Sequence, residues 1–555
     1  MGKESVATDR VRPRAGVSFR GPEGRSKRGM RTGGVGRGHS RILGPMRSLH
    51  LRLAAVAAMF LLAADPALAA YHQLEEIPVE SPVYRLAEDL ASSYAVSSGL
   101  LLTKPWTRAD LGRFLDQLVI DAPAAARDPA VLRLQRELEP AGGFAGLEPM
   151  LSSEQDDVSL EVSPYLHVGY AENRSRFALV RDHRAGVQVS VAFGEHAILF
   201  ADAYAGTKTP GPHGTPDVDG SFTANSTDVT AWVDRGYAMW AGKGFMVRAG
   251  HTWLRWGPGA DGTMALSDAA PAFDVLEARA KLPGEAQYSW FVASLDPALE
   301  SYLAGHRLDL RAGPSVELSF SELARFNGAG NAMRALVPVV PFALLGRAGG
   351  GSRNGPQALE TNNVMYAADF SWTWRPGVRL YGEVALDDVK LDNSRPLQMA
   401  WQAGAHLRRR TDMGVWSLRG EYSRVYPYTY AANNGHHFVH AGFPTGSDLG
   451  PDADRVSARL EWRPNAVWAV GAEGSNLRDG SGVLGVPWSS QAVPTRLISY
   501  PFEQDQRYAL TIAYSPSPSF TLAASAGSAA VSWQPSNAGR DTDGAFGSAR
   551  ATFRW

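Results

Sequence analysis

The chain has 555 residues, no cysteine and a formal net charge of −1 at pH 7, so disulfide bridges, thiolate metal sites and thiol nucleophiles are excluded. That total averages two unlike parts: residues 1–69 carry 13 basic and 4 acidic residues, which leaves 42 basic and 52 acidic residues, a net charge of −10, in residues 70–555. The mildly acidic remainder argues against nucleic acid as a partner.

A secretory signal is predicted near the N-terminus. Residues 46–52 form a basic region, residues 53–64 are apolar, and Ala67 and Ala69 frame a cleavage site of the A-x-A type. As a helix the apolar stretch would reach about 18 Å, short of the roughly 30 Å hydrocarbon core of a membrane. Residues 46–69 are therefore expected to be a signal peptide that is removed and not a membrane anchor.

Residues 1–45 are rich in Arg and Gly and would place an unusually long extension ahead of a signal peptide. We interpret them as a basic extension that results from a wrongly assigned start, with translation beginning at Met46 or Met30. A genuine basic arm is the alternative. Because the mature protein is expected to leave the cytoplasm, neither ATP nor NAD is expected as a cofactor.

Residues 70–150 predict a small helical bundle. Ser81-Pro82 is a helix start, Thr107-Arg108-Ala109-Asp110 resembles a capping box, and Asp128-Pro129 places a cap residue before an N1 proline. Each start precedes apolar residues at helical spacing. Three short helices bury little surface by themselves, so we expect the bundle to pack against something larger.

From about residue 157 to the last residue, segments of roughly ten residues alternate apolar and polar side chains. At the C-terminus Phe553 and Trp555 alternate with Arg550 and Arg554. Such a strand needs water on its arginine face and hydrocarbon on its aromatic face. An aromatic last residue is typical of chains inserted by the outer-membrane barrel-assembly machinery, and Phe553 and Trp555 are the predicted assembly signal.

The connections between these strands fall into two classes. Very short turns are predicted at residues 242–244, 283–284, 312–313, 375–377, 411–414, 463–465 and 516–518. Long connections lie between them, among them residues 257–273, 326–363, 388–399, 425–454 and 477–504. Strict alternation of short turns with long loops is the pattern of an outer-membrane barrel, whose turns face the periplasm and whose loops face outside. We therefore expect an all-β transmembrane barrel over residues 151–555, with a soluble β-protein as the weaker alternative.

About nineteen strand candidates can be counted, whereas barrels of this class have an even number of strands, so one assignment must be wrong. No helix could span a membrane, because the most apolar run of the mature chain, Ala335–Leu345, is broken by Pro338 and Pro341. The helical bundle is expected on the periplasmic side, where it would plug the barrel floor. Arg408-Arg409-Arg410 lies next to a short turn and is expected in the lumen or at the periplasmic rim.

One segment invites a nucleotide-binding interpretation. Gly257, Gly259 and Gly262 match G-x-G-x-x-G after a strand-like run. A dinucleotide fingerprint needs a helix N-terminus at that point to receive the pyrophosphate, and no helical pattern begins at Gly262. We expect instead a barrel loop that faces outward.

The long connection after residue 425 is the main candidate for ligand binding. Aromatic faces can pack on sugar rings, while Arg, Asn and His side chains hydrogen-bond hydroxyl and carboxylate groups. The candidate residues are Tyr422, Arg424, Tyr426, Tyr428, Tyr430, Asn433, Asn434, His436 and His437, with Phe438 beside them. The alternatives are an interfacial girdle or the loop's own core. Trp253, Arg255 and Trp256 form a second candidate patch, for which a girdle role is equally open.

Metal and catalytic interpretations are weaker. His436-His437-x-x-His440 lacks a visible fourth ligand, so no metal is expected. Glu383, Asp387 and Asp388 could suggest a glycosidase, but Glu383 and Asp387 are about 13 Å apart on a strand and do not form a carboxylate pair. We expect a solvated or calcium-bridged acidic rim instead, and a protein that is not an enzyme and needs no cofactor.

Several segments together resemble the capsule assembly Wzi family of gram-negative outer-membrane barrels. They are "RWGPGADGTMALSD" (255–268), "YAADFSWTW" (366–374), "LYGEVALDD" (380–388), "EYSRVYPYTYAANNGHHFVHAGFPTGSDLGPDAD" (421–454), and the N-terminal "SPVYRLAEDLASSYAV" and "LTKPWTRADL". The chain departs from the family at Arg255, where a second Trp is common, and residues 335–356 have no match.

This resemblance implies about 18 strands and a surface lectin that binds and retains capsular or related surface polysaccharide. The implied partners are that polysaccharide, outer-membrane lipid and lipopolysaccharide, and the barrel-assembly machinery during insertion. A porin or polysaccharide export channel is the first alternative, and the helical bundle argues against it. A membrane-embedded hydrolase is the second, and no Ser-His or carboxylate pair at useful spacing supports it.

Overall fold

The computed structural model of this chain describes most of the sequence after the expected signal peptide. The described residues are 73–94, 96, 99–138, 151–155, 157–175, 178–207, 229–338, 340–345, 362–388, 396–489, 497–535 and 541–554. The expected extension, the signal peptide with Ala67 and Ala69, and Trp555 lie outside them.

The three predicted helices are confirmed. They are α2 (Pro82–Ser93), α3 (Arg108–Asp121) and α4 (Pro129–Leu138), with the 3₁₀ helix η1 (Pro123–Arg127) between the last two. Thr107 and Asp110 form a capping box at the start of α3, and Asp128 accepts a hydrogen bond from the Ala130 backbone N–H at the start of α4. Within the described part of the chain, none of the helices has the length and apolar character needed to cross a membrane.

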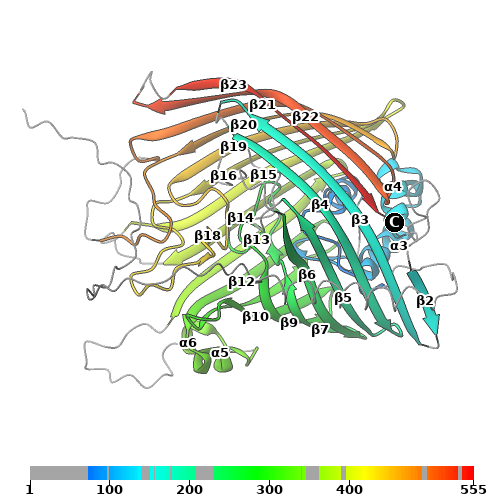
Figure 1. The fold of residues 1–555 in the computed structure, drawn as a ribbon, viewed down its shortest axis with the longest axis horizontal. Helices are drawn as coiled ribbons and strands as arrows, with labels where there is room; N and C mark the ends of the chain where they lie inside the picture. Colours follow the sequence, from blue (N-terminus) through cyan, green and yellow to red (C-terminus); the bar gives the residue numbers. More distant parts are fainter. Residues whose placement is uncertain are drawn as a thin grey trace, which may run out of the picture. The chain divides into compact units, whose positions relative to one another are not determined.

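Eighteen strands of the described residues form a closed antiparallel barrel (Figure 1). They are β3 (Val158–Asn173), β4 (Ala178–Phe193), β5 (Ala197–Gly206), β6 (Thr230–Gly242), β7 (Phe245–Thr252), β9 (Phe273–Leu282), β10 (Ala286–Asp296), β11 (Ser301–Arg311), β12 (Val316–Asn327), β13 (Asn362–Arg375), β14 (Val378–Asp388), β15 (Gln398–Thr411), β16 (Gly414–Val425), β19 (Ala453–Arg463), β20 (Trp468–Asp479), β21 (Phe502–Ser517), β22 (Phe520–Gln534) and β23 (Thr542–Arg554). The fold class and the expected strand number are confirmed.

A nineteenth strand lies outside the ring and before the start of the predicted alternation. The ring closes where β23 pairs with β3, with Arg554 opposite Tyr165 and Phe546 opposite Asn173. Below that point β2 (Leu151–Gln155) pairs with the first residues of β3. The other edge of β3 is paired with β4 along its whole length. β2 therefore lies on the same edge of β3 as β23, beyond the end of β23, and adds no strand to the ring.

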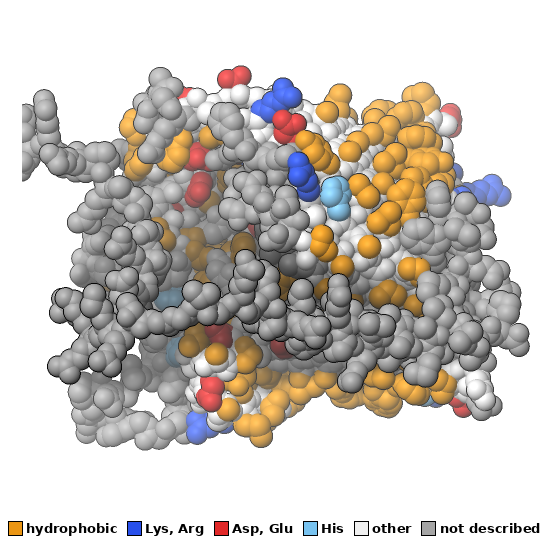
Figure 2. All heavy atoms as spheres, in the orientation of Figure 1, with side chains coloured by type: hydrophobic (Ala, Val, Ile, Leu, Met, Phe, Trp, Pro, Cys, Tyr) orange, Lys and Arg blue, Asp and Glu red, His pale blue; other side chains and the backbone are white. Residues whose placement is uncertain are grey.

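The two faces of the wall differ as the alternation predicts. On β16 Leu418 is exposed on the outer face, whereas Arg419 and Glu421 are buried on the luminal face. Hydrophobic side chains cover much of the wall that is in view in Figure 2. A wall that is apolar outside and charged inside is the arrangement of a transmembrane barrel.

Aromatic rings gather on the outer face near the short turns. Trp468 lies 4.5 Å from Tyr514 and Phe520 lies 4.9 Å from Phe553, measured between ring centroids. Rings at this position are typical of the membrane interface. Phe553, half of the predicted assembly signal, thus belongs to an aromatic girdle.

All seven predicted short turns connect neighbouring strands. The expectation of strict alternation with long loops is wrong at two places, because residues 174–177 and 297–300 make short connections on the long-loop side. The second is tight because the Asp296 carboxylate accepts hydrogen bonds from the backbone N–H groups of Ala298 and Leu299. An Asp side chain that accepts backbone N–H groups in this way stabilises a short turn between two strands, so no longer loop is needed.

Candidate functional site

The short-turn end of the lumen is filled by charged side chains of α2 and their partners on the wall and on β1 (Thr103–Lys104). Glu88 lies 3.1 Å from the Lys104 ammonium group and 3.0 Å from the Arg419 guanidinium group. Asp89 lies 3.0 Å from Nε2 of His406. Burial acts to raise the pKa of Glu88, but Lys104, Arg419 and Arg379 together hold that pKa well below its usual range. The helix is therefore fixed in the lumen as a charged plug.

A second contact binds the rest of the bundle to the wall. Arg408 donates hydrogen bonds to the Asp128 carboxylate and to the Ser93 hydroxyl, at 2.7 and 2.8 Å. Arg410 donates to the Arg127 carbonyl at 3.2 Å. The expected position of the three arginines in the lumen or at the rim is confirmed for these two, and Figure 1 shows α3 and α4 at the end of the barrel where the chain ends.

From the bundle the chain rises into the lumen and meets a loop that comes from the opposite end. Strand β1 (Thr103–Lys104) pairs with β8 (Arg255–Trp256). The Gly257 backbone N–H donates to the Leu102 carbonyl at 2.8 Å. The two ends of the lumen are thus bridged by a short antiparallel contact.

The glycine-containing loop folds into the barrel, and the expectation that it faces outward is wrong. Glu383 accepts hydrogen bonds from the backbone N–H groups of Met264 and Ala265, at 2.9 and 3.1 Å. Glu421 accepts from the Ala260 backbone N–H at 2.7 Å. Carboxylates of the wall therefore take up the loop's N–H groups, which would be costly to bury without acceptors.

The same contacts correct the expected solvated or calcium-bridged acidic rim. Glu383 and Asp387 are buried side chains. Asp387 accepts hydrogen bonds from the Tyr430 backbone N–H and from the Asn363 amide, at 2.6 and 3.0 Å. These carboxylates hold loops in place. The residue pattern gave no sign of this, because the donors are backbone groups of distant segments.

The second candidate patch lies in the interior. Trp253 and Trp256 are buried, and the Trp253 indole N–H donates to the Ala270 carbonyl at 3.1 Å. Trp256 packs edge-on against Phe291. Arg255 is also buried and lies 3.4 Å from the Asp268 carboxylate. These three side chains pack the barrel interior, neither lining its surface nor joining a girdle, because the chain turns inward directly after β7.

Part of the main candidate loop forms its own core, one of the alternatives that the sequence left open. Tyr430 is fully buried; its hydroxyl donates to the Met264 carbonyl at 2.6 Å and accepts from the Ser447 N–H at 3.0 Å. Burial raises the pKa of this hydroxyl. Phe438 is fully buried beside it. Tyr430 therefore fastens the loop to the inward-folded segment.

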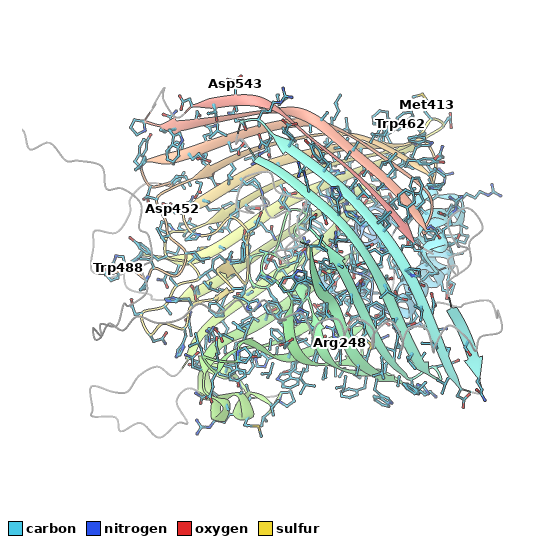
Figure 3. The ribbon with its side chains drawn as sticks, viewed as in Figure 1. Arg248, Met413, Asp452, Trp462, Trp488 and Asp543 are labelled. Carbon is cyan, nitrogen blue, oxygen red and sulfur yellow. The ribbon has the colours of Figure 1, made fainter. Side chains whose placement is uncertain are left out.

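Tyr422 and Arg424 lie on the wall just below this loop. Tyr422 packs 5.1 Å from Trp401 and donates to the Asp454 carboxylate. The Arg424 guanidinium group is buried over the Tyr426 ring, 3.9 Å from Asp452, and makes no hydrogen bond to a described residue. Figure 3 marks Asp452 among the loops at this end.

The remaining candidates reach the surface of the loop. Tyr426, Tyr428, His436 and His437 are half-buried and Asn433 is exposed. Asn434 accepts a hydrogen bond from the His436 N–H and donates to the Asn362 carbonyl. Burial lowers the pKa of both His436 and His437, and the charge of Arg325 lowers them further. The histidines are thus biased toward the neutral form.

A second loop adjoins His437. It was not among the binding candidates predicted from the sequence. A Cβ added to Gly485 would lie 3.8 Å from the His437 ring, which puts residues 480–489 against the main loop. Val483 and Val486 of this loop are exposed, and Trp488 lies at the same end of the molecule (Figure 3). Trp488, an aromatic residue within the long connection 477–504, could have indicated this loop from the sequence. We call the surface of residues 425–452 and 480–489 the loop face.

The described residues contain no group of three or more His, Asp or Glu side chains that could hold a metal ion. His440, the third histidine of the motif, instead contacts the Ala272 carbonyl through Nε2 at 3.2 Å and packs against Phe273. The histidines therefore take part in loop packing.

Comparisons with known proteins find one matching family and several solved structures. The family model for capsule assembly protein Wzi matches residues 155–532. The solved structure of Escherichia coli Wzi, an outer-membrane protein described as a carbohydrate-binding β-barrel involved in group 1 capsule assembly, superposes with a TM-score of 0.60 at 13% identity, over 87% of this chain and 99% of that chain. Two Pseudomonas aeruginosa proteins, OccK5 and OprD, give TM-scores of 0.42 and 0.41 at 9% and 11% identity, over 71% of this chain and 97% and 95% of theirs. No curated protein sequence matches.

Proposed function

From the premise that this chain belongs to the capsule assembly protein Wzi family, we propose that its loop face binds a capsular or related surface polysaccharide and retains it on the outer membrane. The protein would act as a surface lectin that takes part in capsule assembly. The similar E. coli barrel is described as carbohydrate-binding, which supports the same ligand class here.

The observation that carries the proposal is a rigidly mounted loop with half-buried rings at its surface. Tyr426 and Tyr428 are half-buried aromatic residues of the same loop as the half-buried His436 and His437 and the exposed Asn433. Tyr430 below them is fixed by three hydrogen bonds. A preordered surface loses little entropy on binding, and its rings suit the apolar faces of sugars.

The filled lumen favours retention over export. The α2 plug occupies one end and the segment 257–272 folds in from the other, and the two are joined at β1 and β8. A polysaccharide chain would have to displace both to pass. A porin or export channel is therefore the weaker alternative.

We propose binding without catalysis. Glu383, Glu421 and Asp387 of the wall are each engaged by backbone N–H groups of the loops. A glycosidase needs two carboxylates free to act on one bond. The wall carboxylates serve as loop acceptors instead.

The cellular arrangement follows from this function. The loop face would lie outside the cell and the helical bundle in the periplasm, in contact with outer-membrane lipid and lipopolysaccharide. Residues 46–69 would direct export as a signal peptide, and Phe553 with Trp555 would be read by the barrel-assembly machinery. Residues 1–45 would not belong to the mature protein.

A binding assay with the purified, folded barrel tests the proposal. Surface polysaccharide from the source strain is titrated against the native protein and a Tyr426→Ala/Tyr428→Ala variant. Two lost ring contacts at about 0.5–1.5 kcal/mol each predict that binding weakens about five- to 150-fold. Tyr514→Ala, which removes a ring from the girdle near the short turns, is the matched control. Equal losses in both variants, or no binding by the native protein, would refute the proposal.

A further inference from the structure

One apolar segment of the long-loop side lies on the outside of the barrel and has no place in the loop face. It contains α5 (Ala329–Ala335) and α6 (Phe342–Leu345), which Figure 1 shows outside the wall near β10 and β12. We call residues 329–338 and 340–345 the wall flap. Its apolar side chains pack on outward-facing side chains of the wall, with Ala335 and Phe342 beside Ala304, Ala324 and Phe326.

The flap covers polar groups that the wall would otherwise present to lipid. His306 and Glu322 are polar side chains on the outer face, with 2.6 Å between Nε2 of His306 and the Glu322 carboxylate. The Phe342 ring stacks on His306 at 4.5 Å between centroids, and the Phe342 backbone N–H donates to Glu322 at 3.0 Å. The Trp290 indole N–H donates to the Ala335 carbonyl at 3.0 Å. An uncovered carboxylate and imidazole at this position would be costly against hydrocarbon.

This polar cluster lies close to side chains of the apolar belt. Phe320, two residues before Glu322 on the same face of β12, is 56% exposed, and two strand residues separate positions by about 7 Å. Tyr366, directly opposite Glu322 on β13, is also exposed. The flap therefore extends a surface that already faces lipid.

The outer surface of the flap has the same apolar character. Met333, Val337 and Leu344 are 67%, 47% and 55% exposed, and Leu336 is exposed beside them. Arg334 is the single charged residue of the flap, and a long basic side chain can reach from apolar surroundings to the interface.

The flap's backbone is also suited to lipid. Pro338 and Pro341 carry no N–H donor, and the carbonyls of Pro338 and Phe342 accept hydrogen bonds from Tyr288 and Asn362 of the wall. Non-helical backbone at membrane depth requires such internal partners. The prolines that prevent a spanning helix thus remove two groups that lipid could not satisfy.

We propose that the wall flap is embedded in the outer leaflet of the membrane, with its exposed apolar side chains among the lipid acyl chains. This role is independent of the proposed polysaccharide binding: the flap secures the barrel at the membrane surface and seals the His306–Glu322 pair from hydrocarbon.

Site-directed spin labelling tests this placement, because the chain has no cysteine of its own. Single Leu336→Cys, Val337→Cys and Leu344→Cys variants of the full barrel are labelled and reconstituted into phosphatidylcholine vesicles. Phe320→Cys on the apolar belt and Asn433→Cys on the loop face are the matched references. Each variant replaces a side chain that is exposed, so the barrel core is unchanged.

Collision rates with oxygen and with a water-soluble nickel chelate then locate the labels. The three flap labels should match Phe320→Cys, with an oxygen-to-nickel accessibility ratio several-fold above that of Asn433→Cys. Ratios like that of Asn433→Cys would overturn the proposal by placing the flap in water. Labels shielded from both reagents would also overturn it, because a second copy of the chain would then cover the flap.

Discussion

Buried carboxylates decide how the long connections of this barrel fold. Glu383, Glu421 and Asp387 project from the wall and accept backbone N–H groups of two different loops. Each N–H group that enters the lumen without an acceptor would cost about 1–3 kcal/mol. Single side chains of the wall thus select an inward-folded, fixed arrangement over solvated loops.

We expect Glu383→Leu to release the segment 257–272. Leucine has similar volume but leaves the N–H groups of Met264 and Ala265 without their acceptor, at a cost of about 1–3 kcal/mol each. Glu383→Gln should retain the fold, because an amide oxygen can still accept both. Limited proteolysis of the segment in the folded barrel distinguishes the variants, and Glu195→Gln in an exposed turn is the control. Equal cleavage of Leu and Gln variants would contradict the assignment.

The packing of the loop face should weaken in acid. Burial lowers the pKa of His436 and His437, whereas a detached loop would have the ordinary value near 6.5. Below about pH 6.5 the histidines of the detached loop bind protons more readily than those of the packed loop. The packed loop is therefore fully stable above about pH 6.5, and this stability is lost as the pH falls toward the lower pKa values that the histidines have in the packed loop. Hydrogen exchange of residues 425–452, corrected for intrinsic rates, should rise with acid. A His436→Gln/His437→Gln variant should show little of this change; an equal rise in that variant would assign the effect to other groups.

At the scale of elements, neighbouring residues predict which helices and turns form, whereas contacts between distant residues decide where the long loops lie. The helix starts at Ser81, Thr107 and Asp128 and the seven short turns follow from neighbouring residues, and all are present. The inward fold of residues 257–272 depends on Glu383, more than a hundred positions later. The wall flap depends on His306 and Glu322 in the same way. Such pairings leave no periodic signal in one sequence.

The same reasoning explains the candidate site. The aromatic and histidine residues indicated residues 425–452 as a candidate binding loop, because such side chains suit sugar binding; that role stays a prediction. The sequence could not predict which of these residues would be buried. Tyr428 and Tyr430 are the same residue type only two positions apart, yet Tyr428 is half-buried and Tyr430 is fully buried. Tyr430 is fastened by Met264 and Ser447, contacts that exist only in the folded barrel.

We expect that weakening the α2 plug will open the lumen. Glu88→Ala/Asp89→Ala leaves Arg379, Arg419 and His406 without their buried partners, and breaking such pairs costs about 3–5 kcal/mol. Planar bilayers should then show conductance steps that the native protein lacks. Asp116→Asn on the exposed side of α3 is the control. A silent double variant would mean that the inward-folded loop closes the lumen alone.

For the whole molecule, alternation and loop lengths predict a barrel, whereas its closure requires the three-dimensional pairing. The sequence could not show that β2 lies below β23 on one edge of β3 and leaves a ring of eighteen strands. In the proposed function the architecture separates two tasks: the plug and the inward-folded segment 257–272 close the lumen, and the loop face binds the polymer. A closed lumen beneath a fixed, aromatic surface is suited to holding a polymer outside the cell.

The most direct test of this account is the location of surface polysaccharide in a deletion strain of the source organism. Cell-attached, periplasmic and released polymer are compared after complementation with the native gene or with the Tyr426→Ala/Tyr428→Ala variant. We predict unchanged total polymer that moves from cells to medium in the deletion strain and in the variant. Accumulation of polymer in the periplasm would contradict the account and identify the protein as an export channel.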